Sequence, residues 1–165
     1  MSNDGVQKTK TIRVNEMRRR HFTLAILSAV LMPNTLFASS NQLQVFRTET
    51  CGCCGKWVKA MEGQGLKLDV QLVDDETLWR IKNQLEIPLE LSSCHTALAD
   101  NYFVEGHVPA SDIQRLFIER PDARGLCVPG MPIGSPGMEM SEQKESFETL
   151  LVLNGSNTVV FNQHN

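Results

Sequence analysis

The sequence predicts an α/β sandwich, in which a mixed β-sheet with flanking helices ends in a C-terminal hairpin. Residues 43–47 and 66–73 alternate between apolar and polar side chains, as half-buried strands do. Each of these segments is followed by apolar residues at helical spacing. Two turn signals, Asp100–Asn101 and Asn154–Gly155, each separate a pair of short strand-like segments. The resulting order is strand, helix, strand, helix, hairpin, helix, long loop and hairpin.

Three helices are expected in this order. The first lies near 55–62 and ends at the glycines of 63–65, and the second occupies 75–86. The third begins at Pro109, because proline fits the first turn of a helix. The apolar faces of the three helices consist of Trp57, Val58 and Met61, of Leu78, Ile81 and Leu85, and of Ile113, Leu116 and Phe117. Residues 120–140 contain many Gly and Pro residues, so they are predicted to form a long surface loop.

The first 38 residues are predicted to be a leader that precedes a single domain at 39–165. From Met17 the chain reads "MRRRHFTLAILSAVLMPNTLFASSN", with three arginines, an apolar run at 22–32 and then small residues. This order is typical of a secretory signal peptide, and the run is shorter than the ~20 residues of a membrane-spanning helix. Met17 is an alternative start of the chain, and cleavage after Ala38 or Ser40 fits the pattern.

Removal of the leader would leave an acidic domain. The whole chain carries a formal charge of −3, whereas the part from Ser39 onward has 10 Lys and Arg against 17 Asp and Glu, a net charge of −7. This balance disfavours nucleic acid as a partner. The mature form is not expected to span a membrane.

The cysteines suggest a specific chemistry. All five of them lie after the leader, at Cys51, Cys53, Cys54, Cys94 and Cys127. An exported chain meets an oxidising compartment, where an odd number of thiols leaves at least one unpaired or otherwise protected. Within the CxCC motif of residues 51–54, only Cys51 and Cys54 have a familiar disulfide spacing.

The CxCC motif also lies where the first helix is expected to begin. There the free backbone N–H groups and the helix dipole favour thiolate over thiol. Thiolates are both nucleophiles and soft metal ligands, so the motif by itself is compatible with a redox role or a metal role. A dithiol redox enzyme has no need of a third cysteine at Cys53, whereas a thiolate site for several metal ions does.

Further soft donors accompany the motif. Cys94 and His95 begin the predicted third strand, which should come close to the loop that follows the first strand, and His107 lies just past the partner strand. Met131 and Met138 lie in the long loop. Thiolate, thioether and imidazole together are the ligands that Cu(I) favours.

Each of these donors has a structural alternative. His95 is equally well explained as a core histidine, and His107 as a cap of the helix that begins at Pro109. A single methionine more often packs than binds metal. Cys127, between Leu126 and Val128, is interpreted as a small buried hydrophobic residue, and His164 as part of a solvated tail.

Four segments of the chain resemble the CopG-type family of periplasmic copper-resistance proteins. They are "TCGCCGKWV", "SCHTA", "VEGHVP" and "VPGMPIGSPGME", and the likeness extends over about residues 43–162. The resemblance implies a thioredoxin-like fold and several Cu(I) ions per chain in a cysteine-bridged cluster. It also implies a set of ligands, with bridging thiolates at Cys51, Cys53, Cys54 and Cys94 and terminal or nearby ligands at His95, His107, Met131 and Met138.

The leading hypothesis is therefore a periplasmic Cu(I)-binding protein for copper resistance and homeostasis. The family further implies transfer of copper to an exporter or a copper chaperone, and a cluster of this kind is compatible with cycling between Cu(I) and Cu(II). The alternative is a thiol–disulfide oxidoreductase that uses Cys51 and Cys54. Thioredoxins place a cis-proline before the third strand, where this chain has Ser93 and Cys94, and this difference favours metal. Zinc or an iron–sulfur cluster suits the motif less well.

Overall fold

A computed structural model describes residues 42–139, 143–155 and 157–165. The leader predicted at 1–38 lies outside these residues. Within the described part of the chain, no helix is long and apolar enough to span a membrane.

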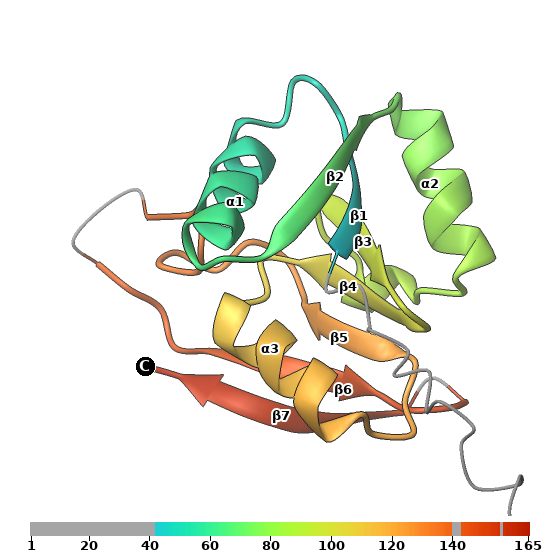
Figure 1. The fold of residues 1–165 in the computed structure, drawn as a ribbon, viewed down its shortest axis with the longest axis vertical. Helices are drawn as coiled ribbons and strands as arrows, with labels where there is room; N and C mark the ends of the chain where they lie inside the picture. Colours follow the sequence, from blue (N-terminus) through green and yellow to red (C-terminus); the bar gives the residue numbers. More distant parts are fainter. Residues whose placement is uncertain (1–41, 140–142, 156) are drawn as a thin grey trace, which may run out of the picture. The chain divides into compact units, whose positions relative to one another are not determined.

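The core of the molecule is a seven-stranded mixed sheet with the strand order β2-β1-β3-β4-β5-β6-β7 (Figure 1). The pairs β1–β2 and β4–β5 are parallel and the other neighbours are antiparallel. The strands are β1 (Gln42–Arg47), β2 (Lys67–Leu72), β3 (His95–Ala99), β4 (Tyr102–Gly106), β5 (Gly125–Val128), β6 (Phe147–Val152) and β7 (Thr158–His164). The predicted α/β class, with a mixed sheet and a C-terminal hairpin, is confirmed, whereas the thioredoxin-like label remains a prediction.

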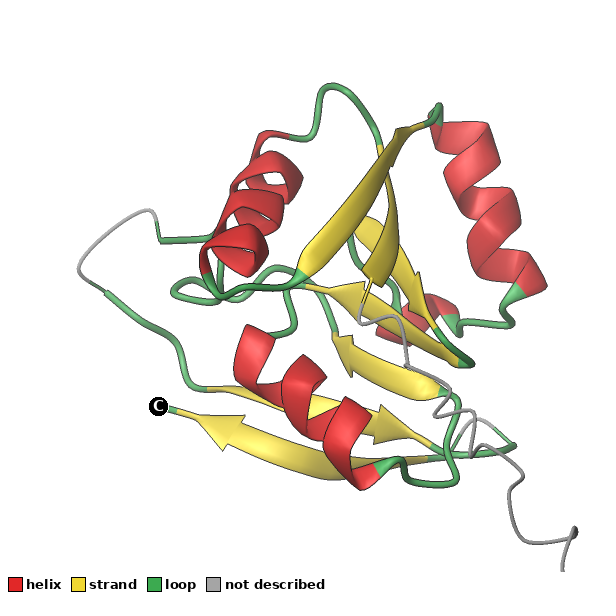
Figure 2. Ribbon diagram, in the orientation of Figure 1, coloured by secondary structure: helices red, strands yellow, loops and turns green. Residues whose placement is uncertain are grey.

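Helices cover both faces of this sheet (Figure 2). They are α1 (Gly52–Gly63), α2 (Asp75–Gln84) and α3 (Ala110–Glu119), with a short 3₁₀ helix η1 (Leu89–Leu91) after α2. The apolar faces of α1 and α3 share one buried cluster with alternate strand residues such as Val45, Ala97, Val104 and Leu126. The other face of the sheet packs against the residues that follow α2 and against η1. The period-two alternation of the strands therefore divides the core into two layers.

The segment 120–140 was predicted to be a long surface loop, but part of it forms strand β5. This strand is fully buried and pairs with β4 on one side and β6 on the other. A run of four residues between Arg124 and Pro129 is too short to show a strand period in the sequence. Gly125 is required by packing, since a Cβ at this position would lie 2.0 Å from the carbonyl oxygen of Phe103.

The C-terminus also differs from the prediction. His164 is not a solvated tail residue but belongs to strand β7, and its Nε2 lies 2.9 Å from Oδ2 of the buried Asp112 on α3. Thr149 and Asn162 donate further hydrogen bonds to the same carboxylate. The register of β6 with β7 creates this network, and a pattern within one strand cannot reveal it.

Candidate metal site

The register of β1 with β3 creates the site. The two strands are antiparallel, and Arg47 at the end of β1 is the partner of His95 at the start of β3. Cys94 therefore stands beside the loop that leaves β1, which is the loop that carries the CxCC motif. This proximity, which was expected from the sequence, is confirmed.

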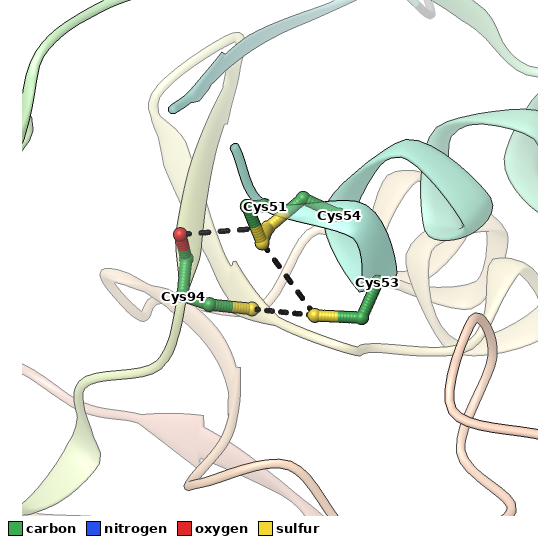
Figure 3. A group of neighbouring side chains, drawn as sticks. All are labelled: Cys51, Cys53, Cys54 and Cys94. Carbon is green, nitrogen blue, oxygen red and sulfur yellow. Dashed lines mark hydrogen bonds between the residues drawn. A yellow bond between two sulfur atoms is a disulfide. The ribbon is translucent and has the colours of Figure 1, made fainter. Parts of the chain in front are cut away.

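Four cysteine sulfurs converge at this point (Figure 3). Their Sγ atoms all lie within 4.8 Å of one another. Cys53 Sγ is 3.5 Å from Cys51 Sγ and 3.7 Å from Cys94 Sγ. Cys54 Sγ lies 3.6 Å from the carbonyl oxygen of Cys94. Three of the sulfurs come from the beginning of α1, and the fourth comes from the start of β3, so the site is assembled by the fold and not by one local segment.

Cys51 and Cys54 form a disulfide in this structure, while Cys53 and Cys94 are free thiols. The disulfide joins the two cysteines whose spacing is the familiar one. In this state two of the four sulfurs are not available as thiolates. The structure therefore represents the oxidised form of the site.

Two histidines extend the site on the side of Cys94. His107 Nε2 lies 3.1 Å from Cys94 Sγ, and its Nδ1 donates to the carbonyl oxygen of Pro136 over 2.8 Å. Because the carbonyl fixes the proton on Nδ1, Nε2 presents its lone pair to the sulfur. This is the arrangement that protein metal ligands commonly have. His107 does not cap α3, whose N-cap residue is Pro109.

His95 combines features of both explanations that the sequence allowed. It is fully buried and packs against the Trp57 ring with 4.4 Å between ring centroids, as a core histidine does. Its Nδ1 lies 3.5 Å from Cys94 Sγ, and its Nε2 is buried without a hydrogen-bond partner. A buried ring nitrogen without a partner is rare, and it fits a group that can bind a metal ion.

Burial favours the uncharged forms of Cys94, His95 and His107 when no metal is bound. Burial, together with the neighbouring Cys53, raises the pKa of Cys94 to about 12. Burial also lowers the pKa of His95 far below its usual value, with help from His107 and Lys82, and lowers that of His107. A cation bound here would therefore displace the thiol proton and meet imidazoles that are already neutral.

The loop that carries the two methionines is attached to this site at three places. Ser93 Oγ donates to the Gly130 carbonyl oxygen over 2.5 Å, and His107 donates to Pro136. At Gly137, which has a φ of +85°, a Cβ would lie 2.7 Å from the Trp57 nitrogen and 2.8 Å from the Cys53 carbonyl oxygen. Only glycine therefore allows the loop to pack directly on the first turn of α1.

The methionines lie on either side of these attachments. Met131 follows Gly130 and is 51% exposed, whereas Met138 follows Gly137 and is half-buried. The fold thus brings the four cysteines and both histidines together and places the methionine loop beside them. The ligand roles of all eight residues remain predictions.

A buried ion pair beneath Cys94 was not predicted from the sequence. Lys82 on α2 pairs with Glu105 on β4, and both are almost completely buried. Thr96 accepts a hydrogen bond from Lys82 and donates one to Glu105. The signal in the sequence was a glutamate inside the otherwise apolar strand "YFVEG", together with a lysine four residues after Leu78 on an apolar helix face.

Comparison with solved structures identifies the family. A structure described as "Copper resistance protein copG- Form 1" is 39% identical, covers 74% of this chain and 96% of its own, and has a TM-score of 0.69. A second, described as Form 2, is 38% identical, covers 75% of this chain and 98% of its own, and has a TM-score of 0.70. The chain belongs to the CopG copper-resistance family. The resemblance that the four sequence segments indicated is therefore confirmed.

A family model described as "Protein of unknown function, DUF411" also matches residues 91–138. The matched segment contains Cys94, both histidines and both methionines of the site, but not the CxCC motif. None of the curated proteins compared with the chain matches it.

Proposed function

We propose that this CopG family member is an exported protein of the periplasm that binds several Cu(I) ions in a cysteine-bridged site and so serves copper resistance. The observation that carries the proposal is the convergence of four cysteine sulfurs with two histidines around Cys94. The names of the structural relatives, which are copper-resistance proteins, support the choice of metal.

The chemistry of the donors also supports copper. Thiolates and imidazoles are soft or borderline ligands that suit Cu(I). A thiolate sulfur can bridge two ions, so four thiolates can hold more than one copper and spread their charge over the bound cations. Cys53 is the natural bridge, because its sulfur lies between those of Cys51 and Cys94.

The remaining residues have supporting roles in this proposal. His107 and His95 would complete the coordination on the Cys94 side, and the methionines would offer thioether sulfurs from the adjacent loop. An exposed thioether at Met131 suits the acceptance of copper from a periplasmic chaperone or its delivery to an exporter. The copper itself would supply any cycling between Cu(I) and Cu(II).

A thiol–disulfide oxidoreductase is the second candidate, and the Cys51–Cys54 disulfide favours it. The two proposals make opposite use of this bond. For copper binding, the disulfide must first accept two electrons and two protons to give two thiols. For an oxidoreductase, the transfer of those electrons to or from a substrate dithiol is the reaction itself.

A Cu(I) titration of the fully reduced and the disulfide-bonded protein distinguishes these roles. We expect more than one Cu(I) per reduced chain, with the ultraviolet absorption of Cu–thiolate bonds, and fewer ions in the oxidised protein. In parallel, both forms are incubated with a dithiol or disulfide peptide. Fast exchange together with no more than one weakly bound copper in the reduced protein would reject the copper proposal in favour of the oxidoreductase.

A further inference from the structure

We infer that the buried Lys82–Glu105 pair positions Cys94 in the metal site by fixing the backbone of Ser93. This inference rests on the proposed function, to which it adds residues that do not touch the metal. The two side chains lie in the interior of the protein, at 2% and 0% side-chain exposure. Buried ion pairs are weak stabilisers, so such a pair calls for another role.

The pair acts on one point of the chain. Glu105 Oε1 accepts the backbone N–H of Ser93 over 2.6 Å, while its Oε2 accepts the hydroxyl of Thr96 over 2.6 Å. Ser93 and Thr96 lie on either side of Cys94 and His95. The carboxylate therefore holds the short segment that presents a thiol and an imidazole to the site, and Lys82 neutralises the carboxylate that does so.

Ser93 also connects this segment to the methionine loop. Its hydroxyl donates to the carbonyl oxygen of Gly130 and also lies 3.9 Å from Cys94 Sγ. Ser93 also packs closely against Gly106, where φ is +75°, since a Cβ added at this glycine would lie only 2.6 Å from the Ser93 Cβ. One residue thus connects the buried charges, the Cys94 sulfur and the loop.

The consequence is a fixed distance between sulfurs from two different elements. Cys94 Sγ is 3.7 Å from Cys53 Sγ and 3.1 Å from His107 Nε2. Among the residues that the structure describes, Glu105 is the only buried acceptor for the Ser93 N–H. Loss of this hydrogen bond would leave the segment before β3 less restrained. Cys94 would then sample positions away from Cys53, and the geometry for binding metal would be present only part of the time.

The test compares Glu105→Gln and the double variant K82M/E105L with Asp112→Asn. The double variant removes both charges at once. It should keep the fold, whereas a variant that leaves one buried charge unpaired can lose it. Asp112 is a matched control, because it is a buried carboxylate on α3 whose three side-chain partners all lie on the β6–β7 hairpin, outside the segment that holds Cys94. Copper affinity is measured by competition with a Cu(I) chelator.

A second readout does not depend on copper. The alkylation rate of Cys94 in the reduced, metal-free protein is followed by mass spectrometry, with Cys53 as the internal reference. We expect about a tenfold loss of Cu(I) affinity and a several-fold faster alkylation of Cys94 in both variants of the pair, as is typical when a partner of a metal ligand is removed. Asp112→Asn should change neither quantity.

Unchanged alkylation and affinity in the double variant would overturn the inference. Equal changes in Asp112→Asn would overturn it too, because the effect would then reflect a general loss of stability. If the wild-type protein bound no copper, the proposed function would fail. The alkylation rates would still decide whether the pair positions Cys94.

Discussion

At the scale of single residues, Cys53 distinguishes this site from a dithiol redox centre. It is the cysteine of the CxCC motif that remains free when Cys51 and Cys54 are bonded, and its sulfur contacts both Cys51 and Cys94. The sequence raised the question of why a third cysteine is present. The geometry supports the answer that it bridges metal between the start of α1 and the start of β3.

Cys53→Ser therefore should bind fewer copper ions per chain while folding normally, because a hydroxyl does not bridge two Cu(I) ions. The measurement is copper per chain after loading and removal of loose metal, with circular dichroism as the check on folding. Full copper stoichiometry in this variant would falsify the bridging role.

Substitution of Cys127, unlike that of Cys53, is expected to leave copper binding unchanged. It is completely buried on the α2 face of the sheet, as the sequence predicted, and it is outside both groups of residues that can hold a metal ion. Cys127→Ala should keep the full copper stoichiometry and lower the free energy of unfolding by about 1–2 kcal/mol, the usual range for a small loss in a core. Urea unfolding and copper analysis check the two parts. A loss of copper would place Cys127 in the site.

Residues of the site differ in how far the sequence could reveal them. Cysteines and histidines are rare and chemically distinctive, so their clustering could be predicted. The roles of Lys82, Glu105 and Ser93 depend on which side chains meet across α2, β3 and β4, and this is fixed only by tertiary packing. The same reason explains why the contact between His164 and Asp112 was missed.

At the scale of elements, the position of the methionine loop depends on its close packing against the first turn of α1. Most elements were predicted near their observed bounds, because their apolar residues repeat at the period of a helix or a strand. Strand β5 was not, because its apolar run is short and its stability comes from pairing on both sides. Its position matters here, because β5 leads directly into the loop that covers the site.

Gly137→Ala should separate this loop from α1. The added Cβ meets the backbone of Trp57 and Cys53 at a φ of +85°, so we expect a loss of about 2–3 kcal/mol in unfolding free energy. Weaker Cu(I) binding should accompany it. Gly130→Ala is the matched control, since φ there is +68° but nothing lies within 4 Å of the added Cβ. It should cost only about 1–2 kcal/mol for the backbone conformation. Equal effects of the two variants on stability and copper affinity would argue against a close fit of the loop.

At the scale of the whole molecule, burial of thiols links stability to pH. The pKa values of Cys94 and Cys127 are raised from 9.0 to about 12, chiefly by burial. Above about pH 9 the unfolded chain loses these protons while the folded chain keeps them, so folding stability falls as the pH rises from 9 towards 12 and is fully retained below 9. Urea unfolding of the reduced, metal-free protein between pH 8 and pH 10.5 measures this decline. Cys127→Ala should make the decline less steep, and an identical slope in that variant would contradict the account.

The whole fold serves to bring two distant segments of the chain to one place. The CxCC motif and Cys94 are 40 residues apart in the sequence, yet the pairing of β1 with β3 brings their sulfurs together.

The central claim is that this convergence holds copper. It is tested most directly by elemental analysis of copper and zinc on protein isolated from copper-grown cells, with thiols titrated before and after chelation. The account predicts at least two coppers per chain and thiols that become reactive only when the metal is removed. Protein without metal, in which Cys51 and Cys54 are bonded and the other thiols react at once, would contradict it.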